Sequence, residues 1–401
     1  MLKKLVGMSG ALAIAQIVNF IAISYGSKLF GAEEFGKYSY VNSLSLAISV
    51  LFYLKSDSVI LLEAKEDISK TFYHINRYST LLLFLLLFFI AFTSLVYHDK
   101  ELIFLTLAGV ILAYFNAKFI LFGSALIKED KTSKYGITAV IRPFLMLIGQ
   151  YIINYIPKVI YPMVIVRILS EIIASIFRRR KEKTDTYEKT KVKSFVLRKK
   201  EYFIYGTVAS LLNSFSQQVP MLILPLKYGY ESLAYFSLAF ALTVVPMSII
   251  LTPLRSLLLK QLAATSVKIE VVYKNTIFLV IPTVLIVVIV NLISDFVVNS
   301  FWGSEWSETS YYMGWISFWV GVGLLSSPSY SYIVYSARQQ LLVSVEKIFL
   351  FFKLIVIISI NIWEIDLNDV ILSFVAIGVL YNITLMIVSF KALSHDCTSR
   401  N

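Results

Sequence analysis

Residues 276–298 read TIFLVIPTVLIVVIVNLISDFVV, and this stretch decides the fold class. It contains 23 residues, of which only Asp295 is charged. A helix rises about 1.5 Å per residue, so about 20 apolar residues cross a hydrocarbon core of about 30 Å. The stretch therefore predicts a helix that spans a membrane.

The composition of the whole chain agrees with this stretch. Of its 401 residues, 58% are hydrophobic and 15% are charged, whereas soluble domains have roughly 45–50% and about 25%. Backbone groups in lipid must be satisfied within the protein, and the apolar runs are too long and too uniform for barrel strands. We therefore predict an all-α integral membrane protein.

Apolar runs of this length recur along the chain. We predict about twelve spans, at residues 5–25, 38–56, 77–97, 102–123, 136–156, 158–177, 203–226, 232–253, 276–298, 311–333, 345–362 and 370–391. The first follows Lys3 and Lys4 as in a signal peptide, but it continues to Tyr25 without a convincing cleavage site. We interpret it as an uncleaved first helix.

The basic residues of the loops predict the orientation of these spans. With a cytoplasmic N-terminus, the inside segments hold 27 Lys and Arg residues and the outside segments hold 5. Cytoplasmic loops carry an excess of Lys and Arg. This ratio predicts an even number of spans with both termini in the cytoplasm.

The most basic segment, residues 178–200, lies near the midpoint of the chain and carries eleven basic and three acidic residues. It is interpreted as a cytoplasmic loop that sets topology, and it also suits contact with anionic lipid headgroups. We predict an N-terminal six-helix lobe at 1–177, a linker at 178–202 and a C-terminal six-helix lobe at 203–401. A weak repeat supports two pseudo-symmetric lobes around a central cavity, because Gly31–Ser39 aligns with Gly229–Ser237 at an offset of 198 residues.

Several basic residues lie inside predicted spans, where an ionisable group costs at least about 2.5–3.5 kcal/mol on insertion scales. Such groups usually face a cavity or a partner. The candidates for a cationic, substrate-binding cavity are Arg142, Arg167, Lys353, Lys118 and Arg255. For Lys118 and Arg255 the alternative is snorkelling to the cytoplasmic interface. A cavity lined by bases favours an anionic substrate.

Acidic and amide residues complete the candidate site. Glu171 lies four residues after Arg167, so the two can pair on one helical face, with a purely structural pair as the alternative. Glu171 and Asp57 are the candidates for coupling to protons or another cation. Candidate polar residues of the cavity are Gln16, Asn19, Asn213, Gln217 and Gln218. These amides would hydrogen-bond sugar hydroxyls, or they would only join helices to one another.

The sequence contains no pattern that is typical of a metal site, an ATP site or a nucleic acid site. Cys397 is the single cysteine and the three histidines are far apart, so we expect no metal site. No phosphate-binding loop of the GxxxxGK[ST] type occurs, and we expect neither bound ATP nor another cofactor. The net charge of +12 is explained by the cytoplasmic loops and does not require a nucleic acid partner.

Three stretches resemble the bacterial O-antigen flippase (Wzx) family, within the multidrug/oligosaccharidyl-lipid/polysaccharide exporter superfamily. GAEEFGKYSYVNSLSLAISVLFYLKSDSVILLEAKED (31–67) is similar to the first two helices of that family, and NSFSQQVPMLILPLKYGYESLAYFSLAFALTVVPMSIILTPL (213–254) to the seventh and eighth. FWGSEWSETSYYMGW (301–315) resembles the outer loop after the ninth helix. The resemblance covers most of the chain, although its motifs are diffuse.

The resemblance implies a flippase of the bacterial inner membrane that works by alternating access, and not an enzyme. Its substrate would be an undecaprenyl-diphosphate-linked oligosaccharide, moved from the cytoplasmic to the periplasmic leaflet for O-antigen synthesis. Implied partners are this lipid-linked oligosaccharide, membrane lipids, a coupling H⁺ or Na⁺ and the polysaccharide polymerase machinery. The alternatives are a multidrug exporter of the same fold, which should carry deep acids, and a polyprenyl-using membrane enzyme such as an O-antigen polymerase, which needs a large loop outside the membrane.

Overall fold

The computed structural model describes residues 2–62, 68–96, 99–129, 131–177, 201–264, 268–336 and 338–398. Within these ranges the regular structure is entirely helical, which confirms the predicted fold class. The elements are α1 (Leu2–Tyr53), α2 (Ser56–Leu62), α3 (Ile68–Thr93), α4 (Lys100–Lys128), α5 (Thr132–Ile153), α6 (Pro162–Phe177), η1 (Glu201–Gly206), α8 (Thr207–Ala264), α9 (Lys268–Phe278), α10 (Val280–Phe301), η2 (Ser304–Trp306), α11 (Ser307–Leu325), α12 (Ser327–Tyr335), α13 (Gln339–Ile362) and α14 (Leu367–Thr398). The basic segment 178–200 lies outside the described residues.

Seven helical segments of the described chain are long and apolar enough to cross a membrane. Two of them, Gly10–Tyr53 and Thr207–Met247, each contain two of the predicted spans or most of them. Each of the other predicted spans coincides largely with a helix or with two consecutive helices, although α6 has only 16 residues. The chain is a multi-pass membrane protein, and the number of twelve spans stays a prediction.

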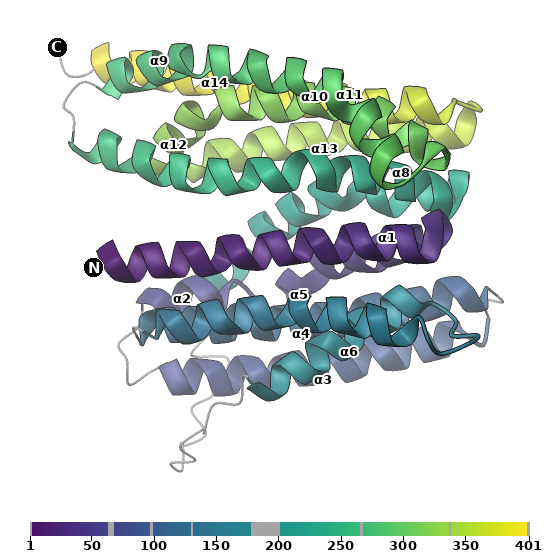
Figure 1. Ribbon diagram of the computed structural model, residues 1–401. Helices are drawn as coiled ribbons and strands as arrows, with labels where there is room; N and C mark the ends of the chain where they lie inside the picture. The colour runs from purple at the N-terminus through teal and green to yellow at the C-terminus, as the bar shows by residue number, and fades with distance from the viewer. Residues whose placement is uncertain are drawn as a thin grey trace. The chain divides into compact units, whose positions relative to one another are not determined.

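The two long helices α1 and α8 are each interrupted at a glycine. Gly31 has φ 82° and ψ 176°, and Gly229 has φ 83° and ψ 167°. Glycine adopts this conformation without the steric cost that a Cβ would bring. In Figure 1, α2 lies at the same end as the chain's N-terminus, so α1 turns back on itself. The two glycines are 198 residues apart, so the weak sequence repeat has a matching repeat in backbone geometry.

Packing groups the chain into two units, Met1–Ala234 and Tyr235–Asn401. Unit 1 holds the predicted N-terminal lobe together with residues 201–234. The predicted linker, 178–202, falls almost wholly outside the described residues. The lobe boundaries therefore stay predictions.

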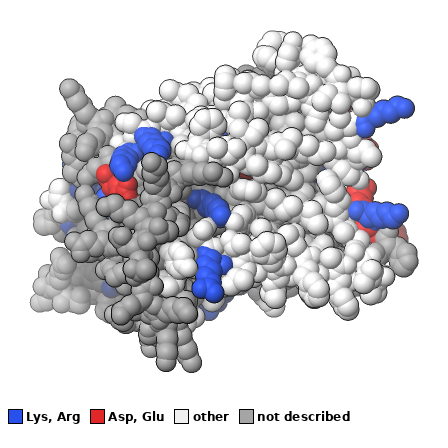
Figure 2. Space-filling view, turned by 90° about the horizontal axis from the view of Figure 1, so that it is seen from below, with Lys and Arg blue, Asp and Glu red and all other residues white. Residues whose placement is uncertain are grey.

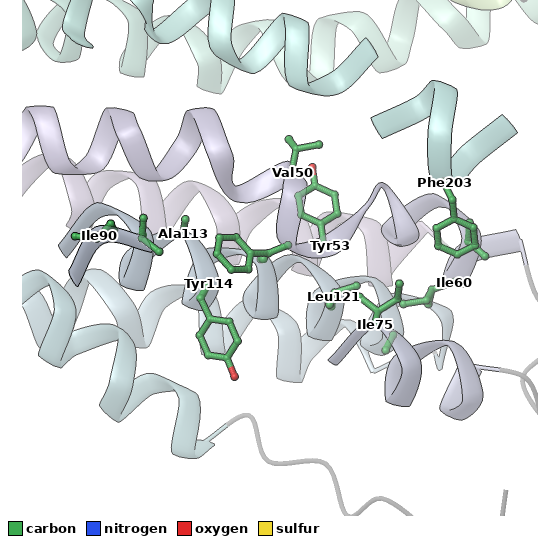
Figure 3. Packing of buried hydrophobic residues seen from close by; sticks show 14 residues of the cluster. Val50, Tyr53, Ile60, Ile75, Ile90, Ala113, Tyr114, Leu121 and Phe203 are labelled. Atoms are coloured by element: carbon green, nitrogen blue, oxygen red, sulfur yellow. The ribbon is translucent and has the colours of Figure 1, made fainter. Parts of the chain in front are cut away.

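Unit 1 has a hydrophobic core where the end of α1 meets α2, α3 and α4. Its fully buried members include Phe52, Ile60 and Leu121, and the Phe52 ring meets Tyr114 edge to face with 6.0 Å between ring centroids. Phe203 of η1 joins the same cluster, as Figure 3 shows beside Ile60. This cluster ties η1, which directly precedes α8, to α1, α2, α3 and α4.

Unit 2 has two smaller clusters around α12. Tyr332 packs with Leu262 and Leu393, while Ile333, the next residue of α12, packs with Phe349 and Leu385. Successive residues of α12 thus face different helices, which places this short helix between α8, α9, α13 and α14. α10 packs against α11, which in turn packs against α14.

The surface of the helices is apolar where a soluble protein would be polar. On α3, Phe84, Phe88 and Phe92 are exposed, and Phe88 leaves 74% of its surface open. Such a large exposed apolar face is rare in soluble monomers and suits contact with lipid. In the face shown in Figure 2, a broad stretch of the described surface carries no charged residue, and Lys, Arg, Asp and Glu lie toward its two ends.

The contacts of unit 1 confirm the predicted alternation of its loops between two sides. Lys37 and Glu101, from two predicted outside segments, form an ion pair with 2.9 Å between Nζ and Oε1. The Tyr161 ring, close to a third outside segment, lies 5.2 Å from Lys37 Nζ. On the predicted inner side, Lys128 Nζ donates to the Leu61 carbonyl at 2.7 Å. These contacts fix relative sidedness, and the cytoplasmic assignment itself stays a prediction.

Unit 2 shows the same alternation. Tyr312 and Asn368, both at predicted outer ends, share a hydrogen bond of 3.1 Å. Arg338 and Ala392, both at predicted inner ends, are joined by a bond of 3.3 Å from the guanidinium to the carbonyl. A missed span between these points would have placed the partners on opposite sides of the membrane.

Candidate functional site

Three charged side chains converge between α5 and α6 of unit 1. Glu171 Oε1 forms an ion pair with Arg167 Nη1 at 3.0 Å. The same oxygen forms an ion pair with Arg142 Nη2 and accepts a hydrogen bond from Arg142 Nε. Glu171 is completely buried, and the network of two bases and one acid has a net charge of +1. The pair of Arg167 and Glu171, predicted from their spacing, is confirmed. The partnership of Arg142 with Glu171, 29 residues away on another helix, was not predicted.

A second set of contacts holds Arg142 in place. Its Nη2 donates to Asn116 Oδ1 at 2.5 Å, and Asn116 Nδ2 donates to Ser45 Oγ at 2.6 Å. The guanidinium carbon lies 4.1 Å from the centre of the Phe119 ring. Arginine stacks well on aromatic rings while its N–H groups bind elsewhere. Helices α1 and α4 thus orient Arg142 independently of α6. Sequence reasoning missed both Asn116 and Ser45, because an isolated polar residue in a span gives no signal of its partner.

The side of α5 that carries Arg142 continues as a buried strip. Arg142, Met146 and Gln150 follow at intervals of four residues and so share one face. The Tyr38 hydroxyl from α1 contacts Met146 Sδ at 4.0 Å and interacts electrostatically with all three charged residues. Gln150 is completely buried, and neither its Oε1 nor its Nε2 has a hydrogen-bond partner within the described part of the chain. Gln150 is a further polar residue that the sequence did not single out.

The arginines are more accessible than the acid that they share. Arg142 and Arg167 expose 14% and 10% of their side chains, whereas Glu171 exposes none. Arg167 Nε is buried and has no hydrogen-bond partner among the residues that the structure describes. Guanidinium groups bind carboxylate and phosphate oxygens through paired, charge-assisted hydrogen bonds. The chemistry that this arrangement supports is therefore recognition of an anion.

The two other charged candidates of unit 1 lie outside this network. Lys118 is half-buried, with Nζ 4.3 Å from the centre of the Tyr114 ring. Asp57 is half-buried and pairs with Lys55 at 3.5 Å between Nζ and Oδ2. The contact of Lys118 is a cation–π interaction with its own helix.

The five polar candidates are divided between α1 and α8. Gln16, Asn19 and Gln218 are half-buried, while Asn213 and Gln217 are exposed. Gln217 Nε2 donates to Asn213 Oδ1 at 2.6 Å within the same helix. The bond between Gln217 and Asn213 therefore lies within one helix and does not join two helices, which was the alternative role predicted for these amides.

Unit 2 contains a second buried polar cluster. Lys353 and Glu346 are each 7% exposed, lie two turns apart on one face of α13 and interact electrostatically. The Tyr381 hydroxyl from α14 hydrogen-bonds Glu346. Arg255 lies against Tyr330, with 4.5 Å from its guanidinium carbon to the ring centre. The sequence singled out Lys353 and Arg255 as candidates for a cationic cavity. It did not single out Glu346, which stands near the end of its predicted span.

A third cluster surrounds Lys37 at the predicted outer end of unit 1. Its Nζ lies 2.7 Å from Glu33, 3.3 Å from Glu34 and 2.9 Å from Glu101, measured to Oε1 in each case. The Lys37 side chain is only 9% exposed, whereas the three acids range from 23% to 69%. The buried base Lys37 therefore neutralises part of the charge of three acids, and its ion pairs join α1 to α4.

We expect that Lys37→Met destabilises unit 1, because three carboxylates then face one another without their base. Partial exposure screens the repulsion, so the expected loss is about 1–2 kcal/mol. A thermal melt of the purified protein measures it, and mildly acidic buffer should restore part of the loss by protonating the acids. Lys131→Met is the control, since Lys131 pairs with Glu129 at 2.8 Å but is 60% exposed. Equal melting temperatures for both variants would contradict the prediction.

Comparisons with known proteins identify the fold. Residues 27–311 match the sequence pattern of a family described as "Polysaccharide biosynthesis protein". A structure of the lipid II flippase MurJ in an inward closed conformation aligns with a TM-score of 0.69 at 15% identity, covering 98% of this chain and 92% of that chain. An inward-facing multidrug resistance MATE family transporter of the MOP superfamily gives 0.67 at 14% identity, covering 96% and 95%, and an outward-facing one gives 0.59 at 12%, covering 98% and 96%. No curated protein sequence matches the chain. The chain has the fold of these membrane transporters, and none of these solved relatives is named as an enzyme.

Proposed function

Since the chain belongs to the family of polysaccharide biosynthesis proteins, we propose that it is a flippase for a lipid-linked saccharide precursor. Its substrate is an oligosaccharide repeat unit on undecaprenyl diphosphate, destined for O-antigen or another surface polysaccharide. The protein carries the head of this lipid from the cytoplasmic to the periplasmic leaflet of the inner membrane by alternating access. MurJ, which shares the fold, is named as a lipid II flippase.

The observation that carries this proposal is the convergence of Arg142 and Arg167 on one buried carboxylate oxygen. Two guanidinium groups in a low-dielectric membrane protein are costly unless they serve a partner. A diphosphate that links a lipid to a sugar carries two negative charges and several oxygens in a row. Its geometry suits two arginines that already meet at one point.

The other candidates have supporting roles in this proposal. Further cations are Lys118, Lys353 and Arg255, and the candidates for sugar hydroxyls are Gln16, Asn19, Asn213, Gln217 and Gln218. The carboxylates of Glu171 and Asp57 are the candidates for coupling to H⁺ or Na⁺. The polyprenyl tail stays in lipid, and a polysaccharide polymerase would receive the product.

The second candidate function is export of drugs, because a multidrug resistance transporter aligns nearly as well as the flippase. Cationic drugs need deep acids, but the network of Arg142, Arg167 and Glu171 has a net charge of +1. The sign of this network favours an anion. A drug-resistance panel on cells that express the protein distinguishes the two functions, since the flippase should confer no resistance.

We expect that Arg142→Ala and Arg167→Ala each reduce surface polysaccharide at least tenfold in a flippase-null strain, compared with the wild-type gene. A hydrogen bond to a charged group contributes about 1.5–3 kcal/mol, which is roughly tenfold or more in binding. Lys353→Ala tests the basic cluster of unit 2 in the same assay. Arg77→Ala is the control, because Arg77 is an exposed arginine on α3 outside these clusters. Full polysaccharide from both arginine variants, at equal protein levels in the membrane, would refute the proposed anion site.

A further inference from the structure

We propose that Gln150 is a saccharide-binding residue, whose side-chain amide hydrogen-bonds a hydroxyl or acetamido group in the head of the substrate. This inference rests on the proposed function, because it adds a sugar contact to the substrate whose diphosphate binds Arg142 and Arg167. The arginines recognise a diphosphate that every such lipid carries, so they do not distinguish one saccharide from another. The amide of Gln150 supplies a contact that does.

The amide of Gln150 is buried and unpaired within the described part of the chain. The residue is completely buried, and neither Oε1 nor Nε2 has a hydrogen-bond partner among the residues that the structure describes. Burying an amide without hydrogen bonds costs free energy, and the large majority of buried polar groups in proteins are paired. One side chain with both an unpaired donor and an unpaired acceptor therefore indicates a group that binds a partner from outside the protein's own packing.

The amide lies between α1 and α6, beside a glycine and a methionine. A Cβ built on Gly26 of α1 would lie 2.4 Å from Gln150 Nε2 and 2.6 Å from Met163 Cε of α6. Because Gly26 has no side chain, separation of α1 from α5 is enough to uncover the amide. The interruption of α1 at Gly31, five residues further on, lets this part of the helix move without the rest.

Gln150 shares a face of α5 with one of the arginines that bind the diphosphate. Arg142, Met146 and Gln150 follow at intervals of four residues, which places Gln150 about 12 Å from Arg142 along the helix axis. In the predicted span 136–156, Arg142 is nearer the inner end and Gln150 nearer the outer end. A saccharide of several sugars can extend along this face, so the first sugar stays beside the arginines and later sugars reach Gln150. The head then points toward the periplasmic side to which it is carried.

The chemistry of an amide fits a sugar better than it fits a phosphate or a cation. The side chain of Gln150 donates through Nε2 and accepts through Oε1. Sugar hydroxyls and acetamido groups also donate and accept, so one such group can satisfy both ends of the amide. A diphosphate diester only accepts and would leave Oε1 unpaired. A cation needs several oxygen ligands, and the neighbouring Gly26 and Met163 supply none from a side chain.

The test compares two lipids with the same tail and the same diphosphate diester but different saccharides. Flippase-null cells with all their glycosyltransferases supply the complete repeat unit on undecaprenyl diphosphate, and cells with only the first of these enzymes supply the lipid with one sugar. Native mass spectrometry of the full-length protein in detergent measures the affinity for each lipid. We expect the wild type to bind the complete unit at least tenfold more tightly than the one-sugar lipid. Gln150→Met should bind the one-sugar lipid as the wild type does and lose about tenfold in affinity for the complete unit.

The outcomes separate this inference from the proposed function. Failure of the wild type to bind either lipid would count against the flippase proposal itself, and the inference would fall with it. Equal binding of both lipids by the wild type would overturn the inference alone, as would an unchanged affinity or an equal loss for both lipids in Gln150→Met. Arg142→Ala is the contrasting variant and should weaken the binding of both lipids alike. Gln340→Met is the matched control, because it makes the same change at an exposed position of α13, and it should bind as the wild type does.

The stability of Gln150→Met tests the unpaired amide separately. Methionine has a similar length and no group that needs a hydrogen bond, so the variant should melt at or above the temperature of the wild type. A variant that melts well below the wild type, or that does not fold, would show that the amide serves the protein's own packing. That result would overturn the inference without any measurement of binding.

Discussion

Replacement of Glu171 by alanine is expected to lower the free energy of unfolding by about 3–5 kcal/mol, because it leaves two buried arginines without their acid. Arg142 and Arg167 expose only 14% and 10% of their side chains, so water compensates them poorly. Titration with a denaturing detergent, followed by circular dichroism, measures this loss. Glu171→Gln should lose less, since the amide oxygen still accepts hydrogen bonds from both arginines.

A triple variant tells whether charge or packing causes that loss. Glu171→Leu combined with Arg142→Met and Arg167→Met removes all three charges and keeps similar volumes. Replacing a buried ionic network by apolar residues is often neutral or stabilising by about 1–4 kcal/mol. The triple variant should therefore be at least as stable as the wild type but inactive in transport. A triple variant as unstable as Glu171→Ala would show that shape, and not charge, holds α5 to α6.

Much of the fold was predictable from the sequence because its signals are local. The length of an apolar run predicts a span without knowledge of its neighbours, as residues 276–298 show, most of which lie in α10. The order of the apolar runs predicted that residues 37 and 101 lie on the same side of the membrane, and the ion pair of Lys37 with Glu101 agrees with it. The spacing of Arg167 and Glu171 predicted their bond because both lie on one helix.

The rest of the site depends on contacts between helices, which sequence spacing does not encode. Nothing around Arg142 indicates that its acid lies on α6 or that Asn116 from α4 holds its other side. Sequence reasoning therefore predicted Arg142 only as a basic candidate of a cationic cavity, where the structure pairs it with Glu171. Glu346 was missed because it stands near the end of its predicted span, and its bond to Tyr381 of α14 is likewise a contact between helices. The sequence indicated that most of the deep charges are positive, but it did not indicate the pairing that sets their net effect.

Gly36 is the residue whose substitution should disturb the packing of unit 1 most directly. A Cβ built on Gly36 would lie 1.8 Å from the Tyr230 carbonyl oxygen and 2.5 Å from its carbon. These are backbone atoms, so no side-chain rotation relieves the clash. Gly36 belongs to the segment 31–39 and Tyr230 to the segment 229–237, the two copies of the weak repeat. The repeated segments thus contact each other, and a glycine permits their close approach.

Gly36→Ala is therefore expected to destabilise the protein by about 3 kcal/mol, at the upper end of what overpacking usually costs. The sign of this stability change distinguishes a clash from helix propensity. Alanine is intrinsically better than glycine in a helix by about 1 kcal/mol, so propensity alone would stabilise the variant. Gly10→Ala is the matched control, since Gly10 also lies in α1 and a Cβ there meets no atom of the described part of the chain within 4 Å. In thermal melts Gly10→Ala should equal or exceed the wild type, while Gly36→Ala should melt well below it. A Gly36→Ala protein as stable as its control would mean that the two repeated segments do not approach this closely, and the close contact would lose its support.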